Sequence, residues 1–363
     1  MGPGRPVGFM FGASDGIIQR TGPAVMRPRP RPPVPYASRL LSPVPSRERP
    51  GASRAYFKGH GLGNDYLVVE EGTAWRASEE AVGRICHRWE GVGGDGVVVL
   101  LRGESPPFRL RMFNPDGSEF VCSGYVLRIL AAHFFRTGRV GSEPFAVVVG
   151  GDSLTMQVHG ADGRGEYDIS VEMGRARVGT EAVGAGAGVV QMESRLALPD
   201  GPRLLAELVS VGNPHCVIFG ESDPWRALTR EALDRLGPVV STHEGFPEGL
   251  NVQLARIVAS DRIEFLVWER GVGHTTASGT SACAVAVAAV VSGRLPPGDK
   301  TLVMEGGTLK VRVEEDLEVV LRGPVRAICD GEVDAGFARV LGGGRLPGPE
   351  AAATTRSEDV GTR

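Results

Sequence analysis

"GHTTASGTSACAVAVAAVV" at residues 273–291 and "SEFVCSGYVLRILAAHFF" at residues 118–135 share the pattern that decides the fold. In each stretch a loop leads into a largely apolar run without Gly or Pro, and a Ser-Gly pair stands at the junction. We therefore expect two helices, over residues 124–136 and 279–293, that begin in the same way.

Short strands separated by turns surround each expected helix. Segments such as "FRLRMFN" before the first helix and "DRIEFLVWERG" before the second read as strands. The order of strands and helix is similar in both parts of the chain. We expect an α+β fold of two pseudo-symmetric domains, each a mostly antiparallel sheet around a central helix, with a site in the interdomain cleft. The expected limits are 55–163 with a returning strand at 325–341 for the N-terminal domain, and 164–324 for the C-terminal domain.

The two ends of the chain have no core-forming pattern. Residues 1–54 hold nine Arg, no Lys, two acidic residues and 11 of the 26 Pro, and cannot bury enough apolar surface to order themselves. This segment is a disordered extension, an Arg-rich transit peptide, or sequence upstream of a misplaced start codon. We also expect residues 342–363 to be a disordered tail.

Composition limits the function classes. Beyond residue 54 the chain has 31 basic and 41 acidic residues, which disfavours nucleic acid as a partner. No apolar run approaches the roughly 20 residues of a membrane span. The five Cys show no paired spacing. We therefore expect no metal site and no disulfide framework, and a reducing compartment such as the cytoplasm.

The two Ser-Gly helix starts suggest an anion site. A helix N-terminus carries unpaired N–H groups and partial positive charge, and Gly lets an anion approach closely. Two such starts facing one cleft could hold one carboxylate from both sides. Ser123 and Ser278 would then flank the carbon bonded to that carboxylate, which suits proton removal on one face and delivery on the other. The alternative is that both serines are only N-caps.

Other polar residues fall at strand ends and turns that would surround the same cleft. An amino-acid zwitterion needs such groups, because Arg binds carboxylates, Glu pairs with ammonium groups, and Asn both donates and accepts. Turn formation and surface ion pairing are the alternative roles. The candidates are Asn64, Asn114, Asn213, Asn251, Glu269 and Arg270.

At these residues the chain resembles diaminopimelate epimerase. The matching motifs span roughly residues 56–341 and are "FKGHGLGNDYLVV", "GVGGDGVVVL", "RMFNPDGSE", "VGNPHCVI", "NVQ" and "WERGVGHT" followed by "SGTSACAVA". The resemblance implies a fold similar to proline racemase and interconversion of LL- and meso-diaminopimelate in lysine biosynthesis without a cofactor. It also implies a homodimer. The Asn, Glu and Arg candidates would bind substrate, and Gly124, Gly279 and Thr280 would lie at its carboxylate.

The chain differs from the family at the residues that carry out the proton transfer. The family's two catalytic Cys correspond to Ser123 and Ser278 in this chain. Tyr125 and Val126 stand where the family has Asn-Gly. A hydroxyl has a higher pKa than a thiol and needs a partner to act as a base. His274, which stands where the family has Glu, could be that partner or an exposed loop residue. Cys122 could substitute after a local shift, whereas Cys283 reads as core.

Three functions therefore remain open. The simplest is an isomerase of the diaminopimelate epimerase type that uses two-base proton transfer. The second is a related isomerase, racemase or dehydratase that acts on another amino acid with Ser-based chemistry. The third is a non-catalytic amino-acid-binding paralogue.

Overall fold

In a computed structural model of the chain, the described residues are 54–70, 77–101, 103, 106–120, 123–186, 195–197, 203–220 and 228–342. The expected disordered segments, 1–54 and 342–363, lie outside them except for residues 54 and 342. No helix in the described part is long and apolar enough to cross a membrane.

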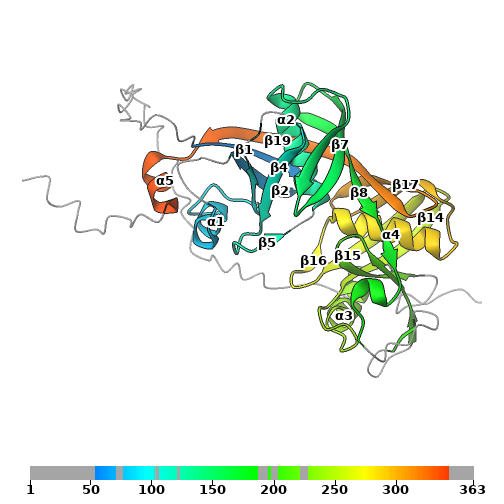
Figure 1. The fold of residues 1–363 in the computed structure, drawn as a ribbon. Helices are drawn as coiled ribbons and strands as arrows, with labels where there is room; N and C mark the ends of the chain where they lie inside the picture. Colours follow the sequence, from blue (N-terminus) through cyan, green and yellow to red (C-terminus); the bar gives the residue numbers. More distant parts are fainter. Residues whose placement is uncertain are drawn as a thin grey trace, which may run out of the picture. The chain divides into compact units, whose positions relative to one another are not determined.

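Ten elements in the first half recur in the same order in the second (Figure 1). The first set is β1 (Ala55–Gly61), β2 (Asn64–Glu70), α1 (Glu79–Cys86), β3 (Val97–Leu100), β4 (Phe108–Phe113), β5 (Glu119–Phe120), α2 (Gly124–Arg136), β6 (Phe145–Val149), β7 (Asp152–Ala161) and β8 (Glu166–Arg175). The second set is β12 (Glu207–Ser210), β13 (Pro214–Phe219), α3 (Arg230–Ser241), β14 (Asn251–Ala259), β15 (Arg262–Glu269), β16 (Gly273–Thr275), α4 (Gly279–Val291), β17 (Gly298–Met304), β18 (Gly307–Val313) and β19 (Glu318–Glu332).

The remaining elements lie outside this repeat. They are β9 (Arg177–Val178), the 3-10 turn η1 (Glu181–Val183), β10 (Arg195–Ala197), β11 (Arg203–Leu205) and α5 (Ala335–Leu341).

Strand pairing repeats with the elements. The parallel pairs β2–β3 and β4–β6 of the first half correspond to β13–β14 and β15–β17 of the second. The other described pairings are antiparallel, and β8 pairs with β19 to join the halves. The expected α+β class with two similar, mostly antiparallel halves is therefore confirmed.

One strand falls on the other side of the expected domain limit. We expected the second domain to begin at residue 164, but β8 pairs with β7 and contacts α2. The repeat of strand pairing therefore places β8 in the first half. The end of β19 pairs with β1 over residues 326–332, whereas residues 335–341, which we expected to belong to a returning strand, form the helix α5.

Helices α2 and α4 are the centres of the two halves. Ten of the thirteen residues of each helix are buried, which is the pattern of a helix surrounded by sheet. Strands β1, β2, β7, β8 and β19 contact α2, whereas β12–β15 and β17–β19 contact α4 (Figure 1). Both helices contribute to one continuous apolar core.

The N-termini of α2 and α4 converge on one side chain. A Cβ placed on Gly124 would lie 2.4 Å from Leu321 Cδ2, and one on Gly279 would lie 3.2 Å from the same methyl group. Leu321 belongs to β19 and is fully buried. Gly124 therefore leaves space that a side chain would take from Leu321, and Gly279 makes the approach of the second helix start less tight.

We expect Gly124→Ala to lower the free energy of unfolding by about 1–3 kcal/mol, because the added methyl group would overlap the enclosed Leu321 side chain. Chemical denaturation measures this change. Gly141→Ala is the control, because a Cβ at Gly141 meets no atom within 4 Å. Equal stability of the two variants would contradict the convergence of the helices at Leu321.

Candidate active site

The two helix starts line one small cavity of about 140 Å³. Nine of the predicted site residues line it: Asn64, Ser123, Gly124, Tyr125, Asn213, Glu269, Ser278, Gly279 and Thr280. Tyr66 and Ala277 complete the lining. Tyr66 was not predicted, although it lies two residues after Asn64 on β2 and so points to the same side of the strand.

The other three predicted residues lie in an adjoining, larger cleft. Asn114, Asn251 and Arg270 line a cleft of about 960 Å³ that shares Asn213 and Glu269 with the small cavity. Arg175, Arg177 and Asp152 also line this cleft, and the sequence analysis did not single them out. The predicted set is thus brought together in two connected compartments rather than in one.

The backbone is nearly identical at the two serines. Ser123 has φ −147° and ψ 119°, and Ser278 has φ −149° and ψ 125°. Their hydroxyls differ. Ser278 is buried and accepts a hydrogen bond from the Ser281 backbone N–H at 3.4 Å, whereas Ser123 makes no side-chain capping bond. Ser278 is therefore an N-cap in part, and Ser123 is not held by its own helix.

Glu269, at the end of β15, is linked to Ser278. Thr275 Oγ1 donates to Glu269 Oε1 at 3.1 Å, and the nearby Ser278 hydroxyl favours the ionised form of the same carboxylate. Burial raises the pKa of Glu269, and the hydrogen bonds from Thr275 and Ser278 offset that rise only in part. The hydroxyl at one helix start thus has a carboxylate nearby whose proton affinity is above its ordinary value.

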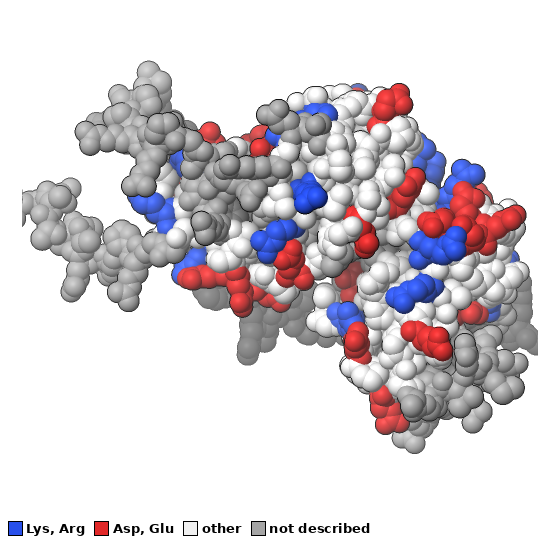
Figure 2. Space-filling model, viewed as in Figure 1, with Lys and Arg blue, Asp and Glu red and all other residues white. Residues whose placement is uncertain are grey.

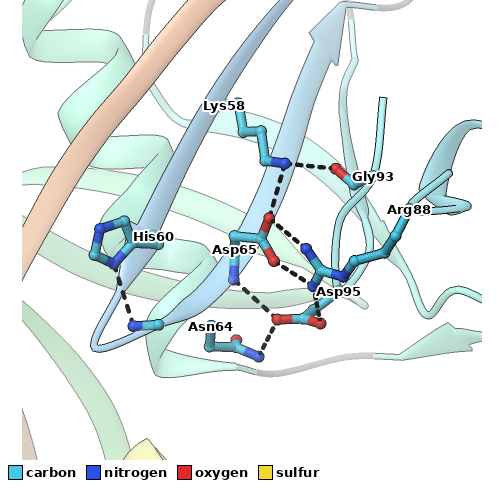
Figure 3. Close-up of polar contacts among 8 residues, drawn as sticks. Lys58, His60, Asn64, Asp65, Arg88, Gly93 and Asp95 are labelled. Atoms are coloured by element: carbon cyan, nitrogen blue, oxygen red, sulfur yellow. Dashed lines mark hydrogen bonds and ion pairs between the residues drawn. The ribbon is translucent and has the colours of Figure 1, made fainter. Parts of the chain in front are cut away.

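A charged network holds Asn64 at the start of β2, directly after the turn from β1 (Figure 3). Asn64 Nδ2 donates to Asp95 Oδ2 at 3.2 Å, and Arg88 bridges Asp95 and Asp65. Lys58 Nζ lies 2.9 Å from Asp65 Oδ2. Because a carboxylate only accepts, the Asn64 NH₂ group must face Asp95, and its carbonyl oxygen is left to accept from a ligand.

A second chain of polar groups orients Asn213. Asn213 Nδ2 lies 3.4 Å from Thr280 Oγ1, and Asn213 Oδ1 lies 2.8 Å from Nε2 of the buried His215. Gln253 connects the other nitrogen of His215 to Ser281 in the first turn of α4. Burial lowers the pKa of His215 to about 3, so the ring is neutral and one nitrogen donates while the other accepts.

Asn251 and Arg270 make local contacts. Asn251 Nδ2 donates to the Pro214 carbonyl and Asn251 Oδ1 accepts from the Arg270 backbone N–H, both at 3.0 Å. Arg270 Nη1 donates to the Glu248 carbonyl at 2.7 Å, and this side chain is exposed. Asn251 therefore ties two site loops together, and Arg270 faces the larger cleft.

His274 and Cys122 are the two residues suggested as substitutes for the serines. His274 does not line the small cavity, and its ring nitrogens lie 2.7 Å from Arg230 Nη1 and 2.5 Å from Glu305 Oε2. The suggested partnership of His274 with Ser278 therefore has no contact to support it. Cys122 lies outside the described residues. Cys283 is fully buried in α4, as expected for a core residue.

The Asp65 network should make stability depend on pH. Burial raises the pKa of Asp65, but hydrogen bonds from Arg88 and Lys58 outweigh that effect and lower it from 3.8 to about 2. The stabilisation is complete above about pH 4 and is lost as the pH falls towards 2, and it amounts to about 2 kcal/mol.

Between pH 5 and 3 we expect Asp65→Asn to lose less stability than the wild type in chemical denaturation. An equal loss would contradict this, and Glu90→Gln, at a neighbouring exposed acid, is the control.

Comparison with known proteins identifies the family. A family model described as "Diaminopimelate epimerase" matches residues 56–179 and 207–328, and these segments follow the structural repeat. The diaminopimelate epimerase of Bacillus pumilus (strain SAFR-032) is 33% identical over 282 residues, which is 76% of this chain and 97% of that protein.

Two solved structures share the fold. A protein described as a predicted epimerase from Pseudomonas aeruginosa has a TM-score of 0.53 at 22% identity. The matched region covers 77% of this chain and 99% of the Pseudomonas chain. A probable proline racemase from Agrobacterium radiobacter K84 has a TM-score of 0.56 at 15% identity, and covers 77% of this chain and 93% of its own. Taken with the family model and the sequence identity, this places the chain in the diaminopimelate epimerase family.

Proposed function

We propose that the chain is a cofactor-independent epimerase that interconverts LL- and meso-diaminopimelate by moving the proton on the α-carbon from one face to the other. The observation that carries this proposal is the pair of Ser-Gly helix starts, alike in backbone conformation, that line one cavity with Glu269, Asn64 and Asn213. The proposal includes a role in lysine biosynthesis, a homodimer and a cytoplasmic location, which rest on the family resemblance and the cysteine pattern.

The substrate's α-carboxylate would lie at Gly124 and Gly279. Both residues begin thirteen-residue helices, whose first backbone N–H groups have no partner within the helix. The two helix starts and their partial positive charges would hold the carboxylate from both sides. They would also stabilise the additional negative charge that develops when the α-proton leaves.

The substrate's ammonium groups and distal carboxylate would use the remaining polar residues. The Glu269 carboxylate and the Asn64 carbonyl oxygen are acceptors in the small cavity and suit the α-ammonium group. The larger cleft offers Arg177 and Arg270 for a second carboxylate, and Asp152 for a second ammonium, whereas Arg175 is already ion-paired with Asp316 and Glu318. A substrate with a zwitterion at each end suits this division into two compartments.

Glu269 makes proton removal by Ser278 chemically reasonable. Ser278 would take the α-proton as its own hydroxyl proton passes to Glu269, and Ser123 would deliver its proton to the opposite face of the α-carbon. Water would then return a proton to the Ser123 oxygen and take the proton from Glu269, which restores both groups for the next turnover. The C–H bond that breaks on one face is replaced by a C–H bond on the other, so no redox partner is needed. The raised pKa of Glu269 favours its acceptance of the proton.

The observed size of the cavity favours a second candidate. Tyr125 stands where the family has Asn, and its ring lies 3.8 Å from the position of a Cβ on Gly279. A cavity narrowed by an aromatic ring suits a smaller amino acid, so a related racemase or isomerase is the alternative. A dehydratase acting on another amino acid remains part of this alternative, as does a binding protein without turnover.

The described surface agrees with a small-molecule ligand rather than nucleic acid. On the face drawn in Figure 2, Lys and Arg are interspersed with Asp and Glu. Many charged side chains of the described residues form ion pairs, such as Arg111 with Glu119 at 2.7 Å and Arg256 with Glu264 at 2.7 Å. A face of mixed sign provides no continuous basic track for a phosphate backbone.

Incubation with LL-diaminopimelate in D₂O tests the reaction, with α-deuteration followed by NMR and the epimer ratio by chromatography. We expect exchange by the wild type, and a loss of about 10²–10⁴-fold in Ser278→Ala, Ser123→Ala and Glu269→Gln, because each removes a proton carrier. The exchange rate should rise with pH through the pKa of Glu269, which lies above its usual range, because only the carboxylate form accepts a proton.

Two further variants sharpen this experiment. Ser292→Ala at the end of α4 is the matched control and should exchange like the wild type, because Ser292 bonds only carbonyl groups of its own helix. Ser278→Cys should exchange faster and depend less on Glu269, since a thiol ionises more readily than a hydroxyl. Full exchange by Ser278→Ala would show that the serine is only a helix cap.

A further inference from the structure

Arg128 is a fully buried cation that has no hydrogen-bonding partner in the described part of the protein. It lies in the second turn of α2, and its side chain is 0% exposed. Its Nε, Nη1 and Nη2 atoms are all without a hydrogen-bond partner among the described groups. Because guanidinium groups stay protonated in proteins, such an arrangement is costly and calls for an explanation.

The guanidinium group lies beside the N-terminus of α2. Arg128 follows Gly124 by four residues, and helical side chains lean towards the N-terminus. Its Nη1 is 3.7 Å from the position of a Cβ on Gly124, and its Nη2 is 3.3 Å from that of a Cβ on Gly61. The two glycines therefore leave the space that this group occupies.

Tyr125 separates Arg128 from the cavity. The Arg128 guanidinium carbon is 4.9 Å from the centroid of the Tyr125 ring, and Tyr125 itself lines the cavity. Arg128 is not part of the lining. Its positive charge is therefore placed directly behind the helix start, separated from the cavity by one aromatic ring.

No carboxylate neutralises this charge by direct contact within the described residues. Asp168 acts on Arg128 through its charge, but Arg322 holds the Asp168 carboxylate with bonds of 3.0 and 2.5 Å. Burial lowers the pKa of Arg128, and the negative groups around it oppose this. Apart from the Tyr125 ring, over which the guanidinium group lies, the native protein thus keeps a positive charge that no carboxylate contacts among the described residues, at the place where the proposed function puts an anion.

We propose that Arg128 is a fixed positive charge that strengthens binding of the substrate carboxylate at the starts of α2 and α4, through Tyr125 and without touching the ligand. This inference rests on the proposed carboxylate position. In an interior that screens charge weakly, a cation behind the helix start adds to the partial charges of the two helix N-termini. A bound carboxylate would in turn relieve the cost of burying Arg128.

The variant Arg128→Met distinguishes a residue that supports ligand binding by its charge from a residue that only stabilises the fold. Replacing an unpaired buried charge by an apolar side chain of similar length should leave the melting temperature unchanged or raise it. Affinity for LL-diaminopimelate, measured by calorimetry, should fall at least tenfold. Arg128→Lys keeps the charge and should retain most of the affinity. Arg136→Met, on the same helix but ion-paired with Asp330, should bind like the wild type.

Two other ligands test whether Arg128 acts on the carboxylate groups of the ligand rather than on its ammonium groups. 1,5-Diaminopentane is diaminopimelate without its carboxylates, and its affinity should not fall in Arg128→Met. Acetate is titrated in parallel, so that dependence of carboxylate binding on Arg128 is measured even if diaminopimelate is not the substrate. If Arg128→Met does not fold, the ¹⁵N guanidinium resonance of Arg128 in the wild type should shift with diaminopimelate and acetate but not with the diamine.

The outcomes separate this inference from the proposed function. Unchanged carboxylate affinity in a folded Arg128→Met variant, or no shift of the Arg128 resonance with either carboxylate, overturns the inference even if the wild type exchanges the α-proton. Arg128-dependent carboxylate binding without any α-proton exchange supports the inference and overturns the proposed reaction.

Discussion

The meeting of two helix N-termini at Leu321 is the constraint on which the rest of the structure depends. Each helix start carries partial positive charge, so bringing two together is unfavourable unless negative groups lie nearby. The buried core around α2 and α4 holds them in place, and Gly124 and Gly279 leave the space for this approach. Glu269 is the acidic side chain in the cavity that they form. The result is a small, positively biased compartment with one carboxylate in its lining, which is suited to an anionic group on a zwitterion.

The structural repeat explains why the site residues come in corresponding pairs. Asn64 ends the turn between β1 and β2, and Asn213 occupies the turn between β12 and β13. Asp95 precedes β3 and receives the NH₂ group of Asn64, while Asn251 begins β14 and bonds the Pro214 carbonyl beside Asn213. The pairs are not identical in chemistry. The pKa of Glu269 responds to the serine of the second half, whereas no carboxylate is seen to respond to Ser123 among the described groups, so the two faces of the cavity differ in their surroundings.

Much of the fold followed from local sequence patterns, whereas several contacts did not. The expected start of α2 at Gly124 is confirmed, and the helix expected over 279–293 ends at Val291 because Gly293 adopts φ +69° and closes it. Helices α1 and α3 were missed although Ser78 and Thr229 cap them, because their short amphipathic patterns compete with surrounding turns. The roles of Asn251 and Arg88 depend on partners 37 and 23 residues away, which periodicity cannot supply. The unpaired state of Arg128 could not be read from the sequence, because it depends on how five strands enclose α2.

A crystal structure of the protein with LL-diaminopimelate tests the central claim most directly. One carboxylate of the ligand should accept hydrogen bonds from backbone N–H groups at the starts of both α2 and α4. Its α-carbon should lie between the hydroxyls of Ser123 and Ser278, and its far end should extend into the cleft lined by Arg175 and Arg270. A ligand bound at only one helix start, or held entirely in the larger cleft with the small cavity filled by Tyr125, would contradict the claim that the two helix starts form one carboxylate site.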